Sequence, residues 1–177
     1  ERAKKIASDL MLMGHPKPKK KQMVNVTRNM EKTLNLFKNQ FISENINLVK
    51  KYYPVSNIKL NNCQIKQIFI NILHNAIDAI KIKKQEENKI IILIQEKKKY
   101  IEIRIGDTGI GMDKNTKNKI LDPFFTTKGG YSTTKEHIEG TGLGLSLSYK
   151  LIKENNGTLN IISKKRVGST FIIKFFK

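Results

Sequence analysis

The sequence predicts an α/β two-layer sandwich, in which three helices cover one face of a mixed, mostly antiparallel sheet of about five strands. Short runs of apolar residues, typical of strands, alternate with longer segments in which apolar residues recur every three or four positions, typical of helices. The last two apolar runs, at 157–163 and 168–175, are separated by only four residues, which predicts a closing hairpin.

The chain of 177 residues is long enough for one domain of ordinary size with a short appendage. Its longest uninterrupted apolar run, residues 90–94, is far shorter than the roughly 20 residues that span a bilayer. The single cysteine, Cys63, excludes an internal disulfide and suits a reducing compartment, so we expect a cytoplasmic domain. Because the chain begins with Glu1, we expect it to be a piece of a longer protein, membrane-anchored or not.

The net charge of +19 raises the possibility of a nucleic-acid partner, because a basic surface attracts phosphate. Almost all of this charge is lysine, scattered along the chain without interleaved aromatic residues, and arginine occurs at only four positions. Base recognition favours the planar arginine fork and aromatic stacking platforms. We therefore expect no nucleic-acid partner, and keep a basic module for nucleic acid or anionic membrane as an alternative.

Residues 1–22 form an amphipathic segment of their own. Apolar residues recur at spacings of three and four from Ala3 to Met13, which predicts a helix that ends at Gly14, before two prolines. A lone helix with one apolar stripe needs a partner. We interpret residues 1–22 as the end of a preceding helical, dimerising module with its linker, and residues 23–177 as the main domain.

The main domain carries the elements of the sandwich. Thr27 is a suitable N-cap for its first helix. The expected elements, in order, are a strand at 24–26, a helix to about residue 39, a strand at 46–52, a helix at 62–84, strands at 89–96 and 100–107, a helix at 143–155, and the hairpin strands at 157–163 and 168–175.

The helix at 62–84 has two unlike faces. At about 100° per residue, one arc of this helix is apolar, which predicts a buried face. It carries Ile65, Ile68, Phe69, Ile72, Leu73, Ala76 and Ile80. Asn71, His74, Asn75 and Asp78 fall on the opposite arc. These polar residues either meet water, as most polar helix faces do, or form one wall of a site.

Two glycine-containing segments could complete such a site. Asp107 ends an apolar strand, and Gly109 and Gly111 let the following backbone turn tightly and approach a ligand closely. A carboxylate there can accept hydrogen bonds from an exocyclic amine. Gly140, Gly142 and Gly144 lead into a helix whose free N–H groups and dipole favour phosphate, and either segment alone could equally be an ordinary loop. 

Residues 122–139 form a long polar segment between these two. Long irregular loops in compact domains are usually functional, and lids over a site are a common case. Phe124 and Phe125 are expected to anchor the lid in an apolar socket, and Lys128 to reach a terminal phosphate or to remain an exposed lysine.

Taken together, four ordered motifs resemble the asparagine box, first glycine box, phenylalanine box and second glycine box of sensor histidine kinases. They are "QIFINILHNAIDAI" (67–80), "GDTGIGM" (106–112), "DPFFTTK" (122–128) and "GTGLGLSLSYKLI" (140–152). The style is similar to that of nitrogen-regulation and sporulation kinases. The resemblance implies a Bergerat-fold catalytic domain that binds ATP and Mg²⁺, with an ATP lid at about 122–141.

The resemblance also implies roles for individual residues. Asn75 would give its side-chain oxygen to Mg²⁺, Asn71 would face the same phosphates, and His74 would touch phosphate oxygens. With Lys128, the two asparagines would be the catalytic residues. Asp107 would hold the adenine amino group. Period-two alternation along the last strand predicts an inner face with Ser169, Phe171, Ile173 and Phe175. The Ser169 hydroxyl would support the adenine contact through water. The implied nucleotide-binding set is Asn71, His74, Asn75, Asp107, Gly109, Gly111, Phe124, Lys128, Gly140, Thr141, Gly142, Leu143, Gly144 and Ser169.

The implied activity is transfer of the ATP γ-phosphate to a histidine on a dimerisation helix, for relay to an aspartate of a response regulator. The expected partners are the protein's own dimerisation helices, a second copy of the chain, and the response regulator. None of His15, His74 and His137 has the sequence context of the acceptor histidine. The chain also departs from the family pattern in carrying extra lid residues around 129–138.

Another ATPase or a serine kinase of the gyrase, MutL and chaperone superfamily is the main alternative. Those proteins carry a glutamate as general base one helical turn before the metal-binding asparagine. This chain has Asn71 there, and an amide cannot take a proton at neutral pH. Hydrolysis of ATP by water is therefore not the expected main role.

Overall fold

A computed structural model describes residues 20–83, 87–128 and 140–177. The predicted N-terminal helix and the central part of the predicted lid, including His15 and His137, lie outside the described residues. Among the helices that are described, none combines the length and apolar character needed to cross a membrane.

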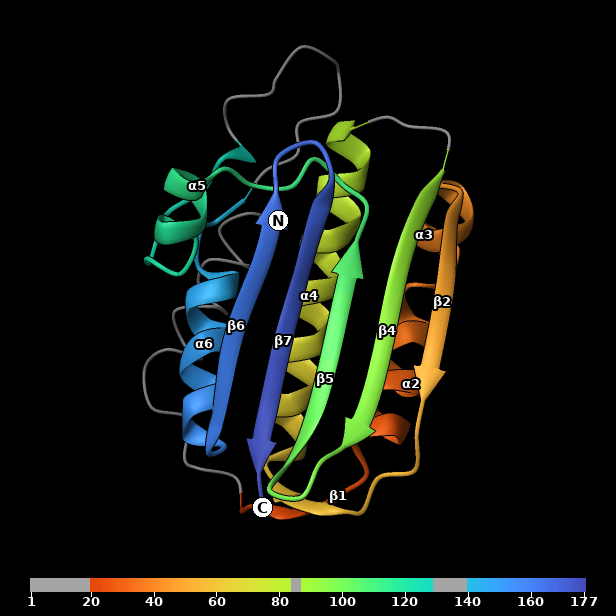
Figure 1. The fold of residues 1–177 in the computed structure, drawn as a ribbon, viewed down its shortest axis with the longest axis vertical. Coiled ribbons are helices and arrows are strands. Elements are labelled where there is room, and N and C mark those ends of the chain that lie inside the picture. The colour runs from red at the N-terminus through yellow and green to blue at the C-terminus, as the bar shows by residue number, and fades with distance from the viewer. Residues whose placement is uncertain (1–19, 84–86, 129–139) are drawn as a thin grey trace.

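The centre of the molecule is a five-stranded sheet in the order β2-β4-β5-β7-β6 (Figure 1). All neighbouring strands run antiparallel except β2 and β4, which are parallel. The predicted mixed, mostly antiparallel sheet is therefore confirmed. Its strands are β2 (Ile46–Tyr52), β4 (Asn88–Glu96), β5 (Tyr100–Asp107), β6 (Gly157–Lys164) and β7 (Gly168–Phe176).

A separate two-stranded sheet differs from the expectation. The strand predicted at 24–26 is β1 (Gln22–Val24), and it pairs antiparallel with β3 (Ile58–Leu60) rather than joining the main sheet. β3 was not predicted, because three residues are too few for a period-two pattern to stand out. 

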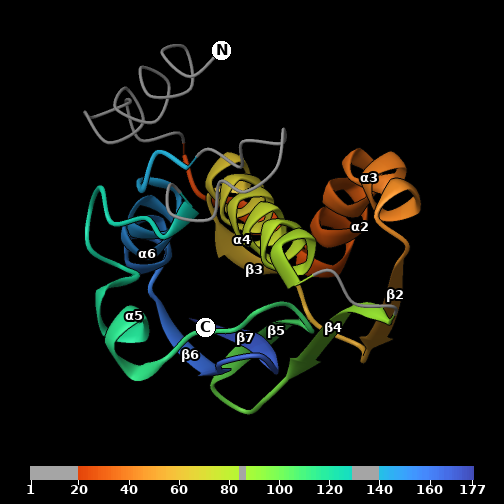
Figure 2. The ribbon, with the colours of Figure 1, turned by 90° about the horizontal axis from the view of Figure 1, so that it is seen from above.

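Three helices cover one face of the main sheet, as Figure 2 shows from above. They are α2 (Val26–Leu36), α4 (Asn62–Lys83) and α6 (Gly144–Glu154), with α4 in the middle. Two shorter helices complete the described fold, α3 (Lys38–Ser43) and α5 (Lys114–Lys119). This arrangement confirms the predicted two-layer sandwich.

The start of α2 corrects one detail of the sequence analysis. The N-cap is Asn25 rather than Thr27, and the Asn25 side chain accepts a hydrogen bond from the Arg28 backbone N–H at 2.9 Å. Asn and Thr are both good N-cap residues, so local propensity alone did not decide between them. The predicted continuous helix to residue 39 is broken at Phe37, where the chain turns into α3.

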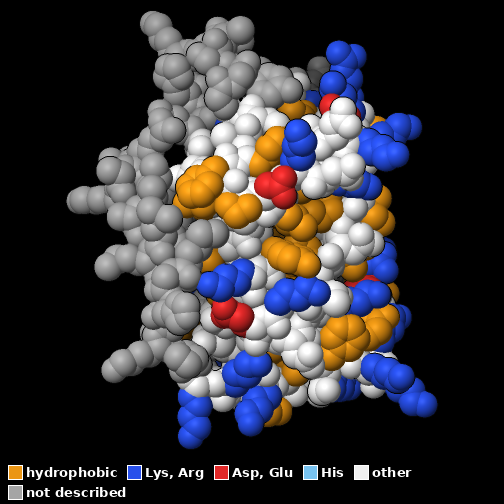
Figure 3. All heavy atoms as spheres, turned by 90° about the vertical axis from the view of Figure 1, so that its left-hand side faces the viewer, with side chains coloured by type: hydrophobic (Ala, Val, Ile, Leu, Met, Phe, Trp, Pro, Cys, Tyr) orange, Lys and Arg blue, Asp and Glu red, His pale blue; other side chains and the backbone are white. Residues whose placement is uncertain are grey.

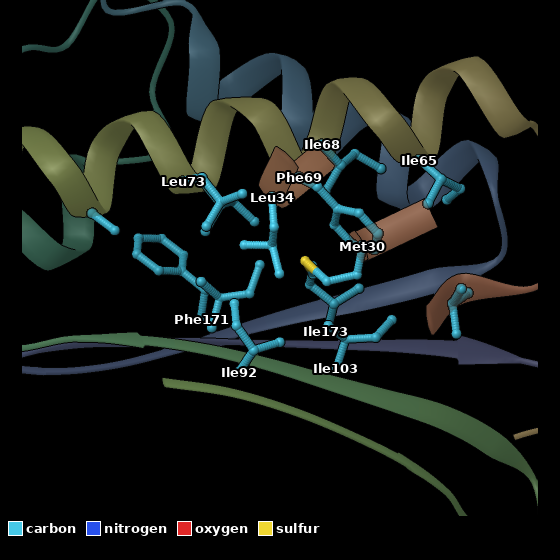
Figure 4. Packing of buried hydrophobic residues seen from close by; sticks show 14 of the residues in the cluster. Met30, Leu34, Ile65, Ile68, Phe69, Leu73, Ile92, Ile103, Phe171 and Ile173 are labelled. Atoms are coloured by element: carbon cyan, nitrogen blue, oxygen red, sulfur yellow. The ribbon is translucent and has the colours of Figure 1, made fainter. Parts of the chain in front are cut away.

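The hydrophobic core lies between α4 and the sheet (Figure 4). Ile68, Phe69 and Leu73 of α4 point toward Ile103 of β5 and Phe171 of β7. The predicted apolar arc of α4 is fully buried, and this leaves the opposite arc, with the two asparagines, free for other contacts. 

The strand register brings three polar residues together below the C-terminal half of α4. Asp107, the last residue of β5, lies opposite Ser169 of β7, and Ser169 lies opposite Ser163 of β6. Period-two alternation places Asp107 and Ser169 on the face that the helices cover, as predicted for β7. The end of the sheet under α4 is therefore polar, while the rest of that face is apolar.

Candidate functional site

The polar face of α4 lines a pocket of about 290 Å³. Asn71, His74, Asn75 and Asp78 form its wall on α4, so the polar residues of this helix line a cavity and are not simply a solvated face. The other lining residues are Gln67, Ile70, Ile120, residues 125–128, Gly140, Thr141, Gly142, Gly144 and Leu145.

Lys128 reaches across the pocket to α4. Its ammonium Nζ donates to Asn75 Oδ1 at 3.0 Å and to Asp78 Oδ2 at 2.5 Å. The side chains of Lys128 and Asp78 are only 21% and 23% exposed, so this ion pair is partly removed from water. Two oxygen atoms of α4 thus hold a positive charge between them.

Asn71 contacts protein groups with both ends of its amide. Its Nδ2 donates to the Gly144 carbonyl at 2.9 Å and to Ser148 Oγ at 3.1 Å, and its Oδ1 accepts from Gln67 Nε2 at 2.9 Å. The bonds to Gly144 and Ser148 connect α4 to the N-terminal part of α6. Asn71 lines the pocket as predicted, but its hydrogen bonds give it a structural role that the sequence analysis did not anticipate.

His74 lines the same pocket and packs against the α2–α3 junction. Its ring meets the ring of Phe37 edge-on, with centroids 4.8 Å apart and planes at 76°. The aromatic contact fixes the position of the imidazole at the pocket wall. 

The N-terminus of α6 faces the pocket without a side-chain cap. The N-cap position is Leu143, which makes no capping hydrogen bond through its side chain, and Gly144 and Leu145 of the first turn line the pocket. The leading N–H groups of a helix are a favourable place for an anion. Leu143 itself is fully buried and does not line the pocket, so its side chain belongs to the core.

The second glycine box packs against the phenylalanine box. Gly142 has φ +70°, and a Cβ there would lie 2.4 Å from the carbonyl carbon of Phe124. A Cβ on Gly140 would lie 2.8 Å from Thr126 Oγ1 and 2.9 Å from Lys128 Cδ. These contacts hold the described ends of the predicted lid together beside α4, with Lys128 pointing into the pocket.

The two phenylalanines of that box do different things. Phe125 is half-buried and lines the pocket, whereas Phe124 is 66% exposed and does not line it. The expectation that both anchor the lid in an apolar socket is therefore wrong for Phe124. Its φ of +65° turns the side chain outward, because the backbone at this point packs against Gly142.

Asp107, Gly109, Gly111 and Ser169 form a second group, outside the pocket lining. Asp107 is only 8% exposed, and its Oδ1 accepts a hydrogen bond from the Gly109 N–H at 2.9 Å. Burial raises the pKa of the Asp107 carboxyl from 3.8 to about 6, against the opposing effects of the Gly109 and Ser169 backbone N–H groups and the Lys83 charge. 

The loop after β5 is held by protein contacts. A Cβ on Gly109 would lie 2.5 Å from the backbone of Ala79 in α4, and Ile110 N–H donates to the Ala79 carbonyl at 3.0 Å. Gly111 has φ +61°, and a Cβ there would lie 2.0 Å from the Lys164 carbonyl oxygen. The close approach predicted for these glycines is therefore an approach to α4 and to the β6–β7 turn.

Ser163 belongs to this second group, although it was not predicted from the sequence. Its hydroxyl accepts from Met112 N–H at 2.8 Å and lies 3.0 Å from the Ser169 hydroxyl. Ser169, the predicted support of the adenine contact, thus shares a hydroxyl pair with the neighbouring strand beside Asp107. Alternation along 157–163 could have placed Ser163 on the inner face, but its partners come from the strand register.

Comparisons with known proteins agree with this geometry. The family model of histidine kinase-, DNA gyrase B- and HSP90-like ATPases matches residues 61–177. The chain is 31% identical over 171 residues to the signal transduction histidine-protein kinase AtoS of Escherichia coli, covering 96% of this chain and 26% of that protein. It is 29% identical over 175 residues to sporulation kinase E of Bacillus subtilis, covering 98% of this chain and 22% of that protein. The chain thus spans about a quarter of the length of these relatives.

Solved structures give the same result. The catalytic domain of histidine kinase ThkA, in a nucleotide-free form, superposes with a TM-score of 0.73 at 27% identity, covering 88% of this chain and 97% of that one. ThkA in complex with the response regulator protein TrrA shares the fold, with a TM-score of 0.78 at 22% identity over 99% of this chain and 47% of that one. The chain belongs to the family of histidine kinase-, DNA gyrase B- and HSP90-like ATPases, and within it to the ATP-binding catalytic domains of sensor histidine kinases.

Proposed function

We propose that this chain is the part of a sensor histidine kinase that binds Mg²⁺·ATP and presents the γ-phosphate to a histidine on a dimerisation domain. One observation carries the proposal. A cation, the Lys128 ammonium, is held by the Asn75 and Asp78 oxygens in the pocket that the uncapped N-terminus of α6 also lines. A favourable position for a cation next to one for an anion suits a metal-bound polyphosphate.

The oxygen ligands of α4 fit Mg²⁺, a hard cation that prefers carboxylate and amide oxygens. Asn75 would be its protein ligand, and the bound metal would neutralise charge on the phosphates. The N–H groups at the start of α6 and the Lys128 ammonium would hold the phosphate oxygens. Phosphoryl transfer asks a protein mainly for such positioning and charge neutralisation.

The adenine would occupy the region next to Asp107. An ionised Asp107 accepts hydrogen bonds, and the adenine amino group is a donor of the right kind. Ser169 and Ser163 would order water beside that contact, since their hydroxyls already form a polar pair under α4. Gly109 and Gly111 would contribute by holding the loop in place against α4.

The acceptor histidine would lie on a dimerisation helix, and residues 1–22 would be the end of that module. His74 packs on Phe37 at the pocket wall, which is not the setting of a phosphorylated histidine that must also reach a second protein. In the longer protein, the phosphate would pass to a response regulator, and the chain would act as a homodimer in the cytoplasm. ThkA, whose fold this chain shares, has been solved with its regulator.

Hydrolysis by water is the weaker alternative. Among the described residues that line the pocket, Asp78 is the only carboxylate, and Lys128 holds it. Asn71, which stands where related ATPases carry a glutamate, has its amide engaged by Gly144 and Ser148. The described pocket therefore lacks the glutamate that serves as general base for water in those ATPases.

A basic module that binds nucleic acid or anionic membrane is a second, less supported alternative. On the face drawn in Figure 3, lysine and arginine side chains are spread among hydrophobic and uncharged ones rather than gathered in one patch. Such a module would bind DNA or anionic vesicles with a steep salt dependence and without regard to ATP.

Calorimetry with a non-hydrolysable ATP analogue tests the proposal. We expect wild type to bind in the presence of Mg²⁺, Asn75→Ala to lose most of the gain that Mg²⁺ gives, and Asp107→Asn to bind at least about tenfold more weakly, the loss expected for a charge-assisted hydrogen bond. Glu87→Gln, which removes an exposed charge paired with Lys89, should bind as wild type does. 

Two results would contradict the assignment: no binding by wild type, or unchanged binding by both site variants. If binding is as expected, phosphotransfer is tested by adding a dimerisation helix in trans and measuring acid-labile phosphohistidine.

A further inference from the structure

The function proposed so far gives Asp78 no contact with the nucleotide, although this residue lines the pocket and pairs with Lys128 at 2.5 Å. It follows Asn75 by about one turn of α4, so both side chains point into the same cavity. Both accept from the Lys128 ammonium, and Asp78 is the partner with opposite charge. The ion pair lies directly beside the predicted metal ligand.

The Lys128 ammonium lies where it contacts the oxygen that Asn75 would give to a metal ion. A metal bound to Asn75 must therefore displace the ammonium from that oxygen, while Lys128 can keep its bond to Asp78. The pocket would then contain one carboxylate, one ammonium and the metal-bound nucleotide. Because the Asp78 and Lys128 side chains are about four-fifths buried, their charges act on each other and on a ligand more strongly than exposed charges do.

We propose that Asp78 makes this site selective for metal-bound over metal-free nucleotide, with Lys128 as its charge-matched partner. The inference rests on the proposed function, since it assigns a specificity role within the same pocket. A nucleotide without its metal brings its full phosphate charge against the Asp78 carboxylate, and the two repel. A nucleotide with its metal brings a cation that the same carboxylate attracts.

Lys128 has the opposite effect. Its ammonium attracts phosphate oxygens and competes with a metal for the Asn75 oxygen. Removing the carboxylate and removing the ammonium should therefore change the preference for the metal in opposite directions. An ion pair with a purely structural role would change the binding of both forms of the nucleotide by the same factor.

The experiment compares the dissociation constant of a non-hydrolysable ATP analogue in EDTA with that in saturating Mg²⁺, measured by calorimetry. The measured quantity is the dissociation constant in EDTA divided by that in Mg²⁺. In Asp78→Asn, we expect this ratio to fall by about tenfold, which is within the usual range for coupling between two ligands. The main cause is that metal-free nucleotide binds more tightly when the carboxylate is absent. In Lys128→Met, the ratio should rise, because metal-free binding weakens most. 

Two further variants control for charge and folding. Glu87→Gln removes the same unit of charge from an exposed position, where Glu87 pairs with Lys89, and should keep the wild-type ratio. Asp78→Glu keeps the carboxylate and should restore most of the ratio. Thermal melts of each variant verify that it is folded before binding is measured.

The outcomes separate this inference from the function on which it rests. If wild type binds the analogue with a clear gain from Mg²⁺ but Asp78→Asn has the same ratio, the selectivity role is wrong and the proposed function stands. The same holds if Asp78→Asn and Lys128→Met move the ratio in one direction. If wild type binds no nucleotide in either buffer, both proposals fail.

Discussion

At the α6 end of the site, amide and charged side chains contact one another across a pocket, whereas at the end of β5 a single carboxylate is buried against backbone. Lys128 and Asp78 balance each other's charge at the first end. Asp107 at the second end has no directly bonded cation among the described contacts, and its main stabilising partners are the Gly109 and Ser169 backbone groups. The α6 end is therefore matched in charge before a ligand binds, and the Asp107 end is not.

This difference explains why the two ends should respond differently to mutation. A buried carboxylate without a countercharge raises the free energy of the folded state, and a ligand that donates to it offsets that cost. A residue of this kind reduces stability for the sake of binding, which is common at functional sites. At the other end, polar contacts such as those of Asn71 both shape the pocket and stabilise the fold.

The largest expected effect on stability comes from Asp107→Asn. The rise of the Asp107 pKa from 3.8 to about 6 corresponds to about 3 kcal/mol of lost stability above pH 6, and the variant removes the charge that causes it. We expect the free energy of unfolding of the nucleotide-free protein to increase by about 1–3 kcal/mol at pH 7, measured by urea unfolding. Nucleotide binding by the same variant should weaken.

The pH dependence provides the check. Because the folded-state pKa is raised, the folded protein binds more protons than the unfolded one between pH 3.8 and about 6. The contribution of Asp107 to stability is therefore complete below this window and is lost as the pH rises through it. The stability difference between Asp107→Asn and wild type should grow across that window and then level off. A difference that does not vary with pH would show that the charge of Asp107 is not the cause.

The contrast between the two ends also shows what could be predicted from sequence. The buried face of α4 follows from helical periodicity, and the inner face of β7 follows from alternation, so both were predicted correctly. Helix α5 was missed because none of its residues is buried, and an exposed helix has no apolar period to detect. Its N-cap, Asp113, was the available signal.

Tertiary partners could not be predicted in this way. Asn71 bonds to a carbonyl 73 positions further along the chain, and Lys128 pairs with a residue 50 positions earlier. The residues that neighbour Asn71 and Lys128 in the sequence do not indicate partners so far away along the chain. The motif resemblance placed these residues at one site, but it suggested a ligand for Asn71 where the fold supplies Gly144 and Ser148.

A smaller loss is expected when Asn71 is replaced by alanine. The change removes the bonds from Asn71 to Gly144 and Ser148 and leaves Gln67 without its partner, at a cost of about 1–2 kcal/mol in the free energy of unfolding. Gln67→Ala, which removes only one of these bonds, should cost less. Urea unfolding of the three proteins measures both changes. Equal stability of wild type and Asn71→Ala would mean that the connection between α4 and α6 is not needed for the fold.

The smallest expected effect distinguishes the two phenylalanines at the head of the predicted lid. Phe124 is 66% exposed, so Phe124→Ala removes little buried surface, and we expect a change below about 0.5 kcal/mol in the free energy of unfolding. Phe125 lines the pocket and is half-buried, so Phe125→Ala should cost more, about 1–2 kcal/mol, and should also weaken nucleotide binding. If Phe124→Ala is the more destabilising of the two, then the outward orientation of Phe124 is wrong, and the sequence-based expectation of an apolar socket for both rings would be restored.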